Sequence, residues 1–267
     1  MPKARTDCPR ISVVTPSFNQ GAFLERTIDS VLSQNYPNLE YIVIDGGSAD
    51  GSVEILRKYA AHLAYWVSEP DRGQAHAINK GLQRATGDWV AWQNSDDVFY
   101  PGAFESLARA ARKHTDAALI IGNMNLIDAD DRLIRDMKYV TPTCDALRAE
   151  GMVLTNQAAF WRRSLHAELG FLDEELDYGF DYDWFLRVLS QGKGAHVDRT
   201  WGGLRLHDAT KTHRHQAEFD EEYRRVLAGR EVSAACRRYH QARRLVLMIA
   251  QGNIGYVLRG LARRMNS

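Results

Sequence analysis

Continuous apolar runs alternate with helically spaced apolar residues over the first hundred positions. The continuous runs predict buried strands at Ile11–Thr15, Tyr41–Ile44, Tyr65–Val67 and Trp89–Trp92. A spacing of three to four residues predicts helices at Ala22–Leu32, Val53–Tyr59 and Ala75–Leu82. Ser52 is a candidate N-cap for the second helix, and Gly87 follows the third. This alternation predicts an α/β fold of Rossmann type, with a mostly parallel central sheet flanked by helices.

The pattern after Pro101 is less regular and predicts a mixed second half of the sheet. It indicates helices at Ala103–Lys113 and Asp181–Leu189, a hairpin of Met124–Asp128 with Leu133–Val140, and short strands at Ala118–Gly122, Gln157–Trp161 and Ala195–Val197. No repeat, low-complexity run or linker divides the body. We therefore expect one α/β domain over residues 10–229 and a helical extension over residues 230–267.

The extension is basic and amphipathic. From Arg230 to the end it contains eight Arg and one Glu, a net charge of +7, and because the whole chain is neutral the body carries −7. The apolar run Leu245–Ala250 is too short to span a bilayer. Such a helix can lie on an anionic membrane, or it can pack on the acidic body or on a second copy of the chain. The helically spaced apolar positions after this run are Ile254, Val257, Leu258 and Leu261.

Composition is that of a soluble globular protein. The 267 residues are 45% hydrophobic, which is enough for one large core. Cys8, Cys144 and Cys236 match no zinc or disulfide spacing, which favours a reducing compartment, and residues 1–10 lack the apolar core of a signal peptide. We expect a cytoplasmic protein, peripheral on the cytoplasmic face of the inner membrane if the extension binds lipid. No basic motif with interleaved aromatic residues is present, so we expect no nucleic-acid partner.

Oxygen-bearing side chains follow the strand at Trp89–Trp92, in the order Asn94, Ser95, Asp96 and Asp97. Carboxylates at the C-terminal edge of such a sheet suit Mg²⁺ or Mn²⁺, which keep part of their coordination shell for water or phosphate oxygens. Asp and Asn are also common in solvated turns for conformational reasons. The residue types alone leave both interpretations open.

Four polar motifs, taken in order, resemble the family 2 glycosyltransferases of GT-A fold. They are Pro16 to Asn19, Asp45 to Ser52, Glu69 to Gln74 with Ala77 and Asn79, and Asn94 to Asp97. The resemblance continues through Phe180 to Arg187 and Leu204 to His207, followed by Thr210 and Thr212, so it covers about residues 11–212. It implies an inverting, metal-dependent enzyme that moves a sugar from a nucleoside-diphosphate donor to an acceptor hydroxyl.

The resemblance also implies roles for individual side chains. The positions that match nucleotide binding are Pro16, Ser17, Phe18, Asn19, Asp45, Arg72, Gln74, Asn79 and Asp96. Asp45 matches the carboxylate that accepts a hydrogen bond from the base, and Arg72 would lie near the pyrophosphate. The structural alternatives are a loop Asp that caps its own turn and an Arg that is a solvated turn residue.

For the metal, Asp96 and Asp97 match the family's acidic motif, with one contacting ribose or sugar and the other the ion. The motif's usual leading Asp is here Asn94. His207 matches a histidine that completes the metal coordination in many relatives. His213 and His215 are nearby competitors for that role.

For catalysis, a single inverting displacement needs a carboxylate that takes the proton of the acceptor hydroxyl. The Glu-Asp pair of the family corresponds to Phe180-Asp181, so Asp181 takes the place of the base and Asp183 is the second candidate. The ring of Phe180 could raise the pKa of Asp181 by desolvation, or it could mark altered acceptor binding. The structural alternative is that Asp181 caps its helix.

We therefore expect a glycosyltransferase that uses a UDP-, GDP- or dTDP-sugar with Mn²⁺ or Mg²⁺. The expected acceptor is a carbohydrate or a lipid-linked molecule in the assembly of a bacterial surface polysaccharide or glycolipid. The alternative is a catalytically inactive nucleotide-sugar-binding protein on the same fold, suggested by Asn94 and Phe180. A nucleotidyltransferase is disfavoured, because the loop from Pro16 to Gly21 is not a glycine-rich triphosphate loop.

Overall fold

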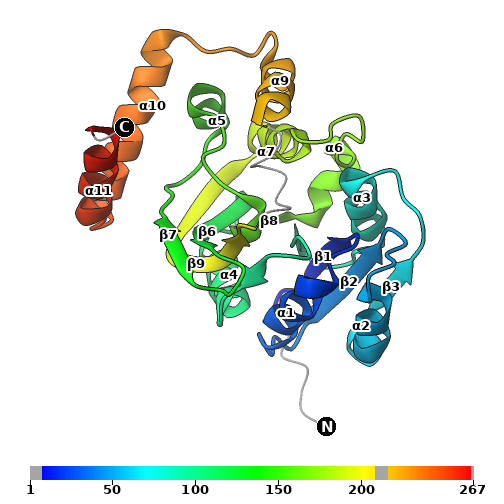
Figure 1. Cartoon of the computed structure of the whole chain (residues 1–267). Helices are drawn as coiled ribbons and strands as arrows, with labels where there is room; N and C mark the ends of the chain where they lie inside the picture. Colours follow the sequence, from blue (N-terminus) through cyan, green and yellow to red (C-terminus); the bar gives the residue numbers. More distant parts are fainter. Residues whose placement is uncertain (1–7, 208–215, 266–267) are drawn as a thin grey trace.

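The protein is built around one sheet with helices packed against it (Figure 1). A computed structural model describes residues 8–207 and 216–265. Within these residues nine strands are ordered β3-β2-β1-β4-β8-β6-β9-β5, and β7 pairs with β6. The strands are β1 (Ile11–Ser17), β2 (Leu39–Asp45), β3 (Tyr65–Ser68), β4 (Trp89–Trp92), β5 (Val98–Phe99), β6 (Ala117–Ile127), β7 (Leu133–Met137), β8 (Ala159–Arg162) and β9 (Lys193–Arg205).

The first half of the sheet is parallel, as predicted. Strand β1 pairs in parallel with β2 and β4, and β2 pairs in parallel with β3. The register places Ser17 beside Asp45, and Asp45 beside Ser68. Because these strands run in the same direction, the polar loops that follow them meet at one edge of the sheet.

The second half of the sheet is mixed. Strand β8 is antiparallel to β4 and β6, β9 is parallel to β6, and β5 is antiparallel to β9. The segments Ala118–Gly122 and Met124–Asp128, predicted as separate strands, belong to one long strand, β6. Its pairing register with β9 shifts between Ile121 and Asn123 and again before Met124, and irregular pairing of this kind breaks the sequence pattern without ending a strand.

The helices differ from the predictions at a few ends. They are α1 (Gly21–Leu32), α2 (Ser52–Tyr59), α3 (Gln74–Arg84), α4 (Ala103–Lys113), α5 (Cys144–Glu150), α6 (His166–Leu169), α7 (Phe180–Gln191), α9 (Gln216–Leu227), α10 (Ala234–Ala250) and α11 (Ile254–Met265), with short 3₁₀ turns at Ala60–His62, Asn156–Ala158 and Arg163–Leu165. The N-cap of α2 is Gly51 at φ 93°, so the prediction of Ser52 was wrong. Ser52 instead donates its hydroxyl to Asp50 Oδ1 at 2.6 Å. The predicted strand at Gln157 begins only at Ala159, because a 3₁₀ turn precedes it.

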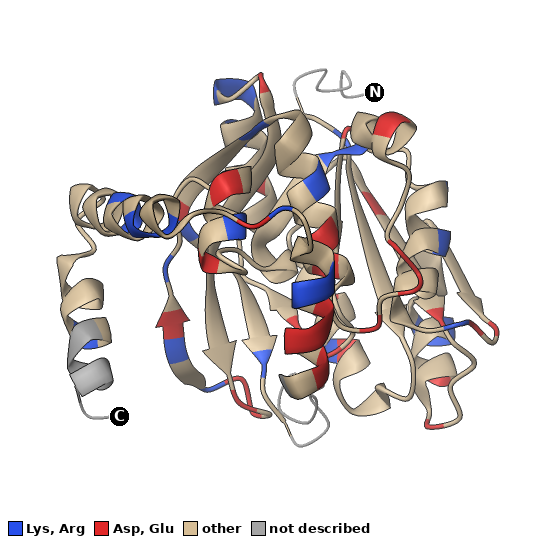
Figure 2. Ribbon diagram, turned by 90° about the horizontal axis from the view of Figure 1, so that it is seen from above, with Lys and Arg blue, Asp and Glu red and all other residues tan. Residues whose placement is uncertain are grey.

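The C-terminal extension forms α10 and α11. Helix α10 packs along α5, and Arg244 Nε donates to Glu150 Oε2 at 2.7 Å. Arg259 of α11 lies 3.1 Å from Asp136 of β7. Figure 2 shows basic residues along α10, and no described helix is both long and apolar enough to cross a membrane.

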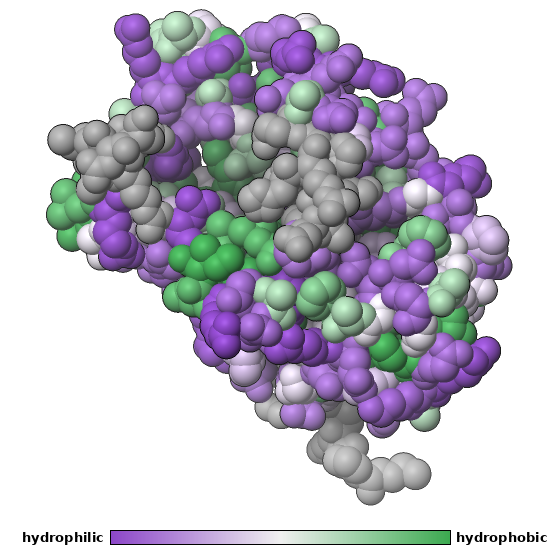
Figure 3. Space-filling view, viewed as in Figure 1, coloured by the Kyte–Doolittle hydropathy of each residue, from purple (hydrophilic) through white to green (hydrophobic). Residues whose placement is uncertain are grey.

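One side of this extension is hydrophobic and exposed. The side chains of Tyr239, Val246 and Ile249 on α10 are between 45% and 63% exposed, and Ile254 and Leu258 on α11 are 55% and 60% exposed. Hydrophobic surface is visible at the left edge of Figure 3, where α10 meets α11, and a second, larger hydrophobic area lies nearer the centre of the same face. The extension therefore buries Met248 and forms polar pairs with the body, but it leaves these other apolar side chains uncovered.

Candidate active site

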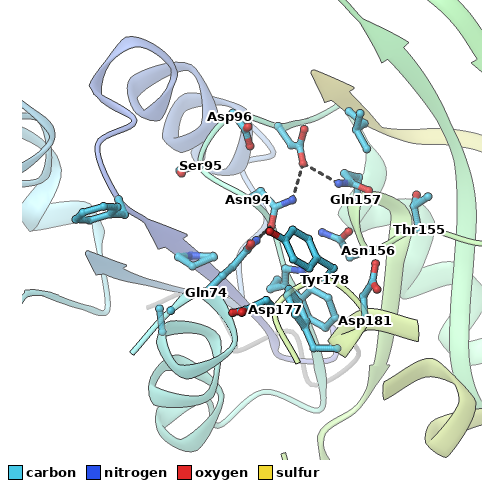
Figure 4. Close-up of a pocket in the computed structure, with 18 of the residues that line it drawn as sticks. Gln74, Asn94, Ser95, Asp96, Thr155, Asn156, Gln157, Asp177, Tyr178 and Asp181 are labelled. Atoms are coloured by element: carbon cyan, nitrogen blue, oxygen red, sulfur yellow. Dashed lines mark hydrogen bonds between the residues drawn. The ribbon is translucent and has the colours of Figure 1, made fainter. Parts of the chain in front are cut away.

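A cavity of about 520 Å³ opens at the edge of the sheet where the loops after β1, β3 and β4 meet (Figure 4). The segment before β8, the start of α7 and helix α9 form the opposite wall. The cavity therefore joins motifs from both halves of the sheet. Its lining includes Pro16, Ser17, Phe18, Gln74, Asp96, Asp97, Asn156, Gln157, Tyr178 and Asp181.

Asp96, in the cavity lining, forms a pair with His207. His207 Nε2 lies 3.0 Å from Asp96 Oδ2, and the imidazole packs on Phe23 with ring centroids 4.6 Å apart. Among the described residues, no group of three or more His, Cys, Asp or Glu could hold a metal ion. The pair still fits Mg²⁺ or Mn²⁺ bound together with a diphosphate, because such ions often take one or two protein ligands and fill the rest with phosphate oxygens and water. Outside the described residues lie Thr210, Thr212, His213 and His215.

Asp97 is buried, and its carboxylate already has three protein donors. Gln157 Nε2 donates to Oδ2 at 2.7 Å and Asn94 Nδ2 at 3.0 Å, while the backbone N–H of Arg205 donates to Oδ1 at 2.9 Å. Burial, followed by the charge of Asp96, raises the pKa of Asp97 well above its usual range. These contacts hold the loop in place and favour Asp96 over Asp97 as a metal ligand.

Asp181 lies in the first turn of α7 and lines the cavity beside Phe180. Burial raises the pKa of Asp181 to about 7, with a smaller contribution from the charge of Glu222, while a hydrogen bond from the backbone N–H of Tyr182 at 2.7 Å opposes the shift. The N-cap position of α7 is Gly179, so Asp181 is not the N-cap residue. A carboxyl group with a pKa near neutrality suits a general base.

Asp183, the second candidate for the base, lies outside the cavity lining. Its carboxylate is 2.7 Å from Arg187 Nε, and Arg230 Nη1 approaches to 4.0 Å. The carboxylate of Asp183 is therefore held in an ion pair on the side of α7. The geometry therefore favours Asp181.

The residues predicted for the nucleotide divide into two groups. Pro16, Ser17, Phe18 and Gln74 line the cavity. The ring of Phe18 is 61% exposed, and Gln74 Nε2 donates to Asn94 Oδ1 at 2.9 Å. An exposed ring beside polar groups is suited to packing against a nucleobase.

Asn19 and Asp45 lie outside the cavity lining and instead join the first two loops. Asn19 accepts at Oδ1 from the backbone N–H of Ala49, and its own N–H donates to Ser48 Oγ at 2.8 Å. Asp45 is fully buried and accepts at Oδ2 from Ser68 Oγ at 2.6 Å and from the N–H of Ser48 at 2.9 Å. These contacts match the alternative of an Asp that caps its own turn.

Arg72 and Asn79 also lie outside the cavity lining. Arg72 Nη2 is 2.5 Å from Glu174 Oε2. Asn79 is buried, donates from Nδ2 to the carbonyl oxygen of Leu172 at 2.9 Å and accepts at Oδ1 from the N–H of the same residue at 3.0 Å. Asn79 thus fastens the segment before α7 to α3, and Arg72 fastens it to the loop that precedes α3.

Several lining residues were not assigned a role from the sequence. Asp71 lines the cavity, and a Cβ on Gly46 would lie only 2.6 Å from Asp71 Oδ2, so this glycine makes room for the carboxylate. Arg205 is buried, donates from Nε to the carbonyl oxygen of Asp96 at 2.7 Å and is paired with Asp131 at 2.5 Å. The residues that helix α9 contributes to the cavity are Phe219, Asp220 and Tyr223.

Comparison with known proteins identifies two kinds of relative by sequence. An uncharacterized glycosyltransferase of Mycobacterium tuberculosis H37Rv is 34% identical over 187 residues, which cover 68% of this chain and 70% of that protein. Chondroitin synthase of Pasteurella multocida is 27% identical over 202 residues, which cover 74% of this chain but 21% of that larger protein.

Solved structures share the fold at low sequence identity. S. aureus TarS 1–349 in complex with UDP-GlcNAc has a TM-score of 0.68 and 18% identity, over 82% of this chain and 66% of that one. The mannosyltransferase PcManGT from Pyrobaculum calidifontis, in complex with GDP-Man and Mn²⁺, has a TM-score of 0.63 and 19% identity, over 97% of this chain and 81% of that one. The mixed, mostly parallel sheet is thus of GT-A type.

The family assignment rests on sequence. The family model described as glycosyl transferase family 2 matches residues 12–169, more than half of the chain, and the mycobacterial relative exceeds 30% identity over two thirds of it. The chain belongs to glycosyl transferase family 2.

Proposed function

We propose that the chain is an inverting, metal-dependent glycosyltransferase that uses a nucleoside-diphosphate sugar. One observation carries the proposal: Asp181, a partly buried carboxyl group whose pKa is raised to about 7, lines the same cavity as Asp96, the partner of His207. A sugar between these groups has the diphosphate on the side of Asp96 and the base on the other. An inverting displacement requires the base and the departing diphosphate to lie on opposite faces of the sugar.

The roles follow from the chemistry of the side chains. Asp96 and His207 would hold the cation, which when bound neutralises charge on the departing diphosphate. Asp181 accepts the proton of the acceptor hydroxyl as the oxygen attacks the anomeric carbon. The C–O bond to the diphosphate breaks while the new C–O bond forms on the opposite face. Ser17, Phe18 and Gln74 face the nucleotide at the other end of the cavity.

The first test is thermal stabilisation by UDP, GDP, dTDP and ADP, each with and without Mn²⁺. One nucleotide should raise the melting temperature in a metal-dependent way, because a ligand at 100 times its Kd adds about 2.7 kcal/mol. Asp96→Asn should lose this shift, and Asp181→Asn should keep it. If no nucleotide stabilises the wild type under any metal condition, the donor-site assignment is wrong.

Turnover separates the enzyme from an inactive binding protein. With the matching nucleotide sugar, the wild type should release nucleoside diphosphate, and Asp181→Asn should do so about 10² to 10⁴ times more slowly, the usual contribution of a general base. Binding of the nucleotide sugar by the wild type without any release, across acceptor preparations, would support the inactive alternative.

We also propose that the acceptor is a carbohydrate or lipid-linked molecule of a bacterial surface polysaccharide or glycolipid. The similarity to a chondroitin synthase supports a polysaccharide product. The exposed apolar residues of α10 and α11 support contact with the cytoplasmic face of a membrane, where such acceptors are held. A second copy of the chain is the other surface that these residues could cover.

A further inference from the structure

Two amide side chains in the cavity wall carry polar atoms that no other described group satisfies. Asn156 and Gln157 are only 6% and 2% exposed. Within the described residues, Asn156 Nδ2 and Gln157 Oε1 are buried and have no hydrogen-bond partner. Buried polar atoms of this kind cost free energy and are rare in proteins. Since both residues line the cavity, a ligand there is the natural partner.

The orientation of Gln157 is fixed by its neighbour. Its Nε2 donates to Asp97 Oδ2 at 2.7 Å, which leaves Oε1 as the acceptor without a partner. The backbone is also held, because a Cβ on Gly202 of β9 would lie 2.0 Å from the carbonyl oxygen of Gln157. The two amides therefore form a rigid wall rather than the tip of a loop.

The two amides lie beside the place that the transferred sugar would occupy. Gln157 contacts the Asp96-Asp97 motif through Asp97, and Figure 4 shows Asn156 between Gln157 and Asp181. The sugar joins the diphosphate near Asp96 and faces the base at Asp181. The wall between these two ends is made by the two amides.

We propose that Asn156 and Gln157 bind a hydroxyl group of the transferred sugar and so help to select it. A hydroxyl accepts a hydrogen bond from Asn156 Nδ2 and donates one to Gln157 Oε1, which satisfies both atoms. The inference rests on the proposed function, because it takes the ligand to be a nucleoside-diphosphate sugar.

The test compares two ligands that differ only in the sugar. The Kd values of UDP with UDP-GlcNAc and UDP-glucose, and of GDP with GDP-mannose, are measured by titration calorimetry with Mn²⁺ and without acceptor. Asn156→Leu, which is similar in size but apolar, should raise the Kd of the bound nucleotide sugar about tenfold and change that of the free diphosphate less than about twofold. Its melting temperature should not fall, because an unsatisfied polar group is removed.

A second variant of Asn156 and a control variant of Gln93 complete the test. Asn156→Asp keeps the shape of the side chain and loses the N–H donor, so it should weaken binding of the nucleotide sugar more than binding of the free diphosphate. This variant keeps the test possible if the leucine variant does not fold. Gln93→Leu is the matched control. Gln93 is also a buried amide whose polar atoms have no partner among the described residues, but it does not line the cavity, and its variant should leave both Kd values unchanged.

The outcomes separate the two proposals. If Asn156→Asp weakens the binding of the free diphosphate and of the nucleotide sugar equally, or changes the binding of neither, the inference is wrong while the proposed function stands. The same holds if both Asn156 variants only lower the melting temperature. If the wild type binds no nucleoside diphosphate at all, the proposed function fails and the inference falls with it.

Discussion

Asp96 and Asp97 are adjacent in the sequence, yet their carboxylates have opposite surroundings. Among the described residues Asp96 lines the cavity beside the imidazole of His207, whereas Asp97 is 2% exposed and accepts three hydrogen bonds. One residue is therefore available to a ligand, and the other holds the loop. The two residues have the same chemistry, and it is the difference in burial that assigns one to a ligand and the other to the loop.

This contrast gives a prediction for two alanine variants. Asp97→Ala leaves three buried donors without an acceptor, so it should lower the free energy of unfolding by about 3 kcal/mol. Asp96→Ala should change that free energy by less than about 1 kcal/mol but abolish metal-dependent stabilisation by the nucleotide. Urea denaturation and thermal shifts measure the two effects. Equal loss of stability in both variants would contradict the assignment.

The raised pKa of Asp181 predicts the pH dependence of both activity and stability. Activity should rise with pH through about 7, as the carboxylate forms. Because the folded-state pKa exceeds the unfolded value of about 3.9, the folded protein binds more protons between these values, and stability falls as pH rises from about 4 through 7. Asp181→Asn removes this loss of stability with rising pH, because asparagine does not titrate.

The Asp181→Asn variant should therefore be about 10² to 10⁴ times slower but more stable than the wild type at pH 8, with a smaller difference in stability at pH 5. Melting temperatures across this range test the sign. Asp183→Asn is the control, because Asp183 is paired with Arg187 outside the cavity lining and should leave the pH profile of activity unchanged. A wild-type rate that is flat between pH 6 and 8 would count against Asp181 as the base.

At the scale of elements, helix α9 holds the entry to α7. Glu222 accepts backbone hydrogen bonds from Asp177, Tyr178 and Gly179 at 3.1, 2.8 and 2.6 Å. These N–H groups precede the helix that carries Asp181. The carboxylate thus fixes both the loop and the wall of the cavity next to Asp181.

Replacing Glu222 by Gln should lower the free energy of unfolding by about 2 kcal/mol, because charge-assisted hydrogen bonds are lost. The rate of transfer should fall as well, since the wall next to Asp181 loosens. Glu221→Gln is the matched control, because Glu221 is the exposed neighbour on the same helix. An unchanged melting temperature for Glu222→Gln would show that these contacts add little.

Much of the parallel half of the sheet could be predicted, because each strand is a continuous apolar run followed by a polar loop. The long strands β6 and β9 could not, because shifts in their pairing interrupt the pattern. Among the residues that line the cavity, Ser17, Asp96 and Asp181 stand in motifs that could be recognised in the sequence. The surroundings of Asn79 and Asp45 could not, because Asn79 is bound by Leu172, 93 positions away, and Asp45 by Ser68, 23 positions away.

At the scale of the whole molecule, the exposed apolar side of the extension predicts a measurable surface property. The double variant Val246→Asp with Ile249→Asp should lose flotation with vesicles that contain anionic lipid, while nucleotide binding stays unchanged. Arg57→Glu on α2 also changes the net charge by −2 at an exposed position and is the control for charge. If the wild type does not float but is a dimer that the double variant dissociates, these residues cover a second copy of the chain instead.

The two halves of the sheet also have a consequence for how specificity can change. Loops after the parallel strands β1, β3 and β4 line one side of the cavity, whereas residues from 152 onward line the other side and include Asp181, the two amides and helix α9. The two sets face each other across the cavity and are joined beside it, where Asp96 contacts His207 and Asp97 accepts from Gln157. On the proposed function, substitutions in the amides or in helix α9 would alter the sugar or the acceptor while Ser17, Phe18 and Gln74 keep their places in the lining, so that new linkages would arise without rebuilding the nucleotide site.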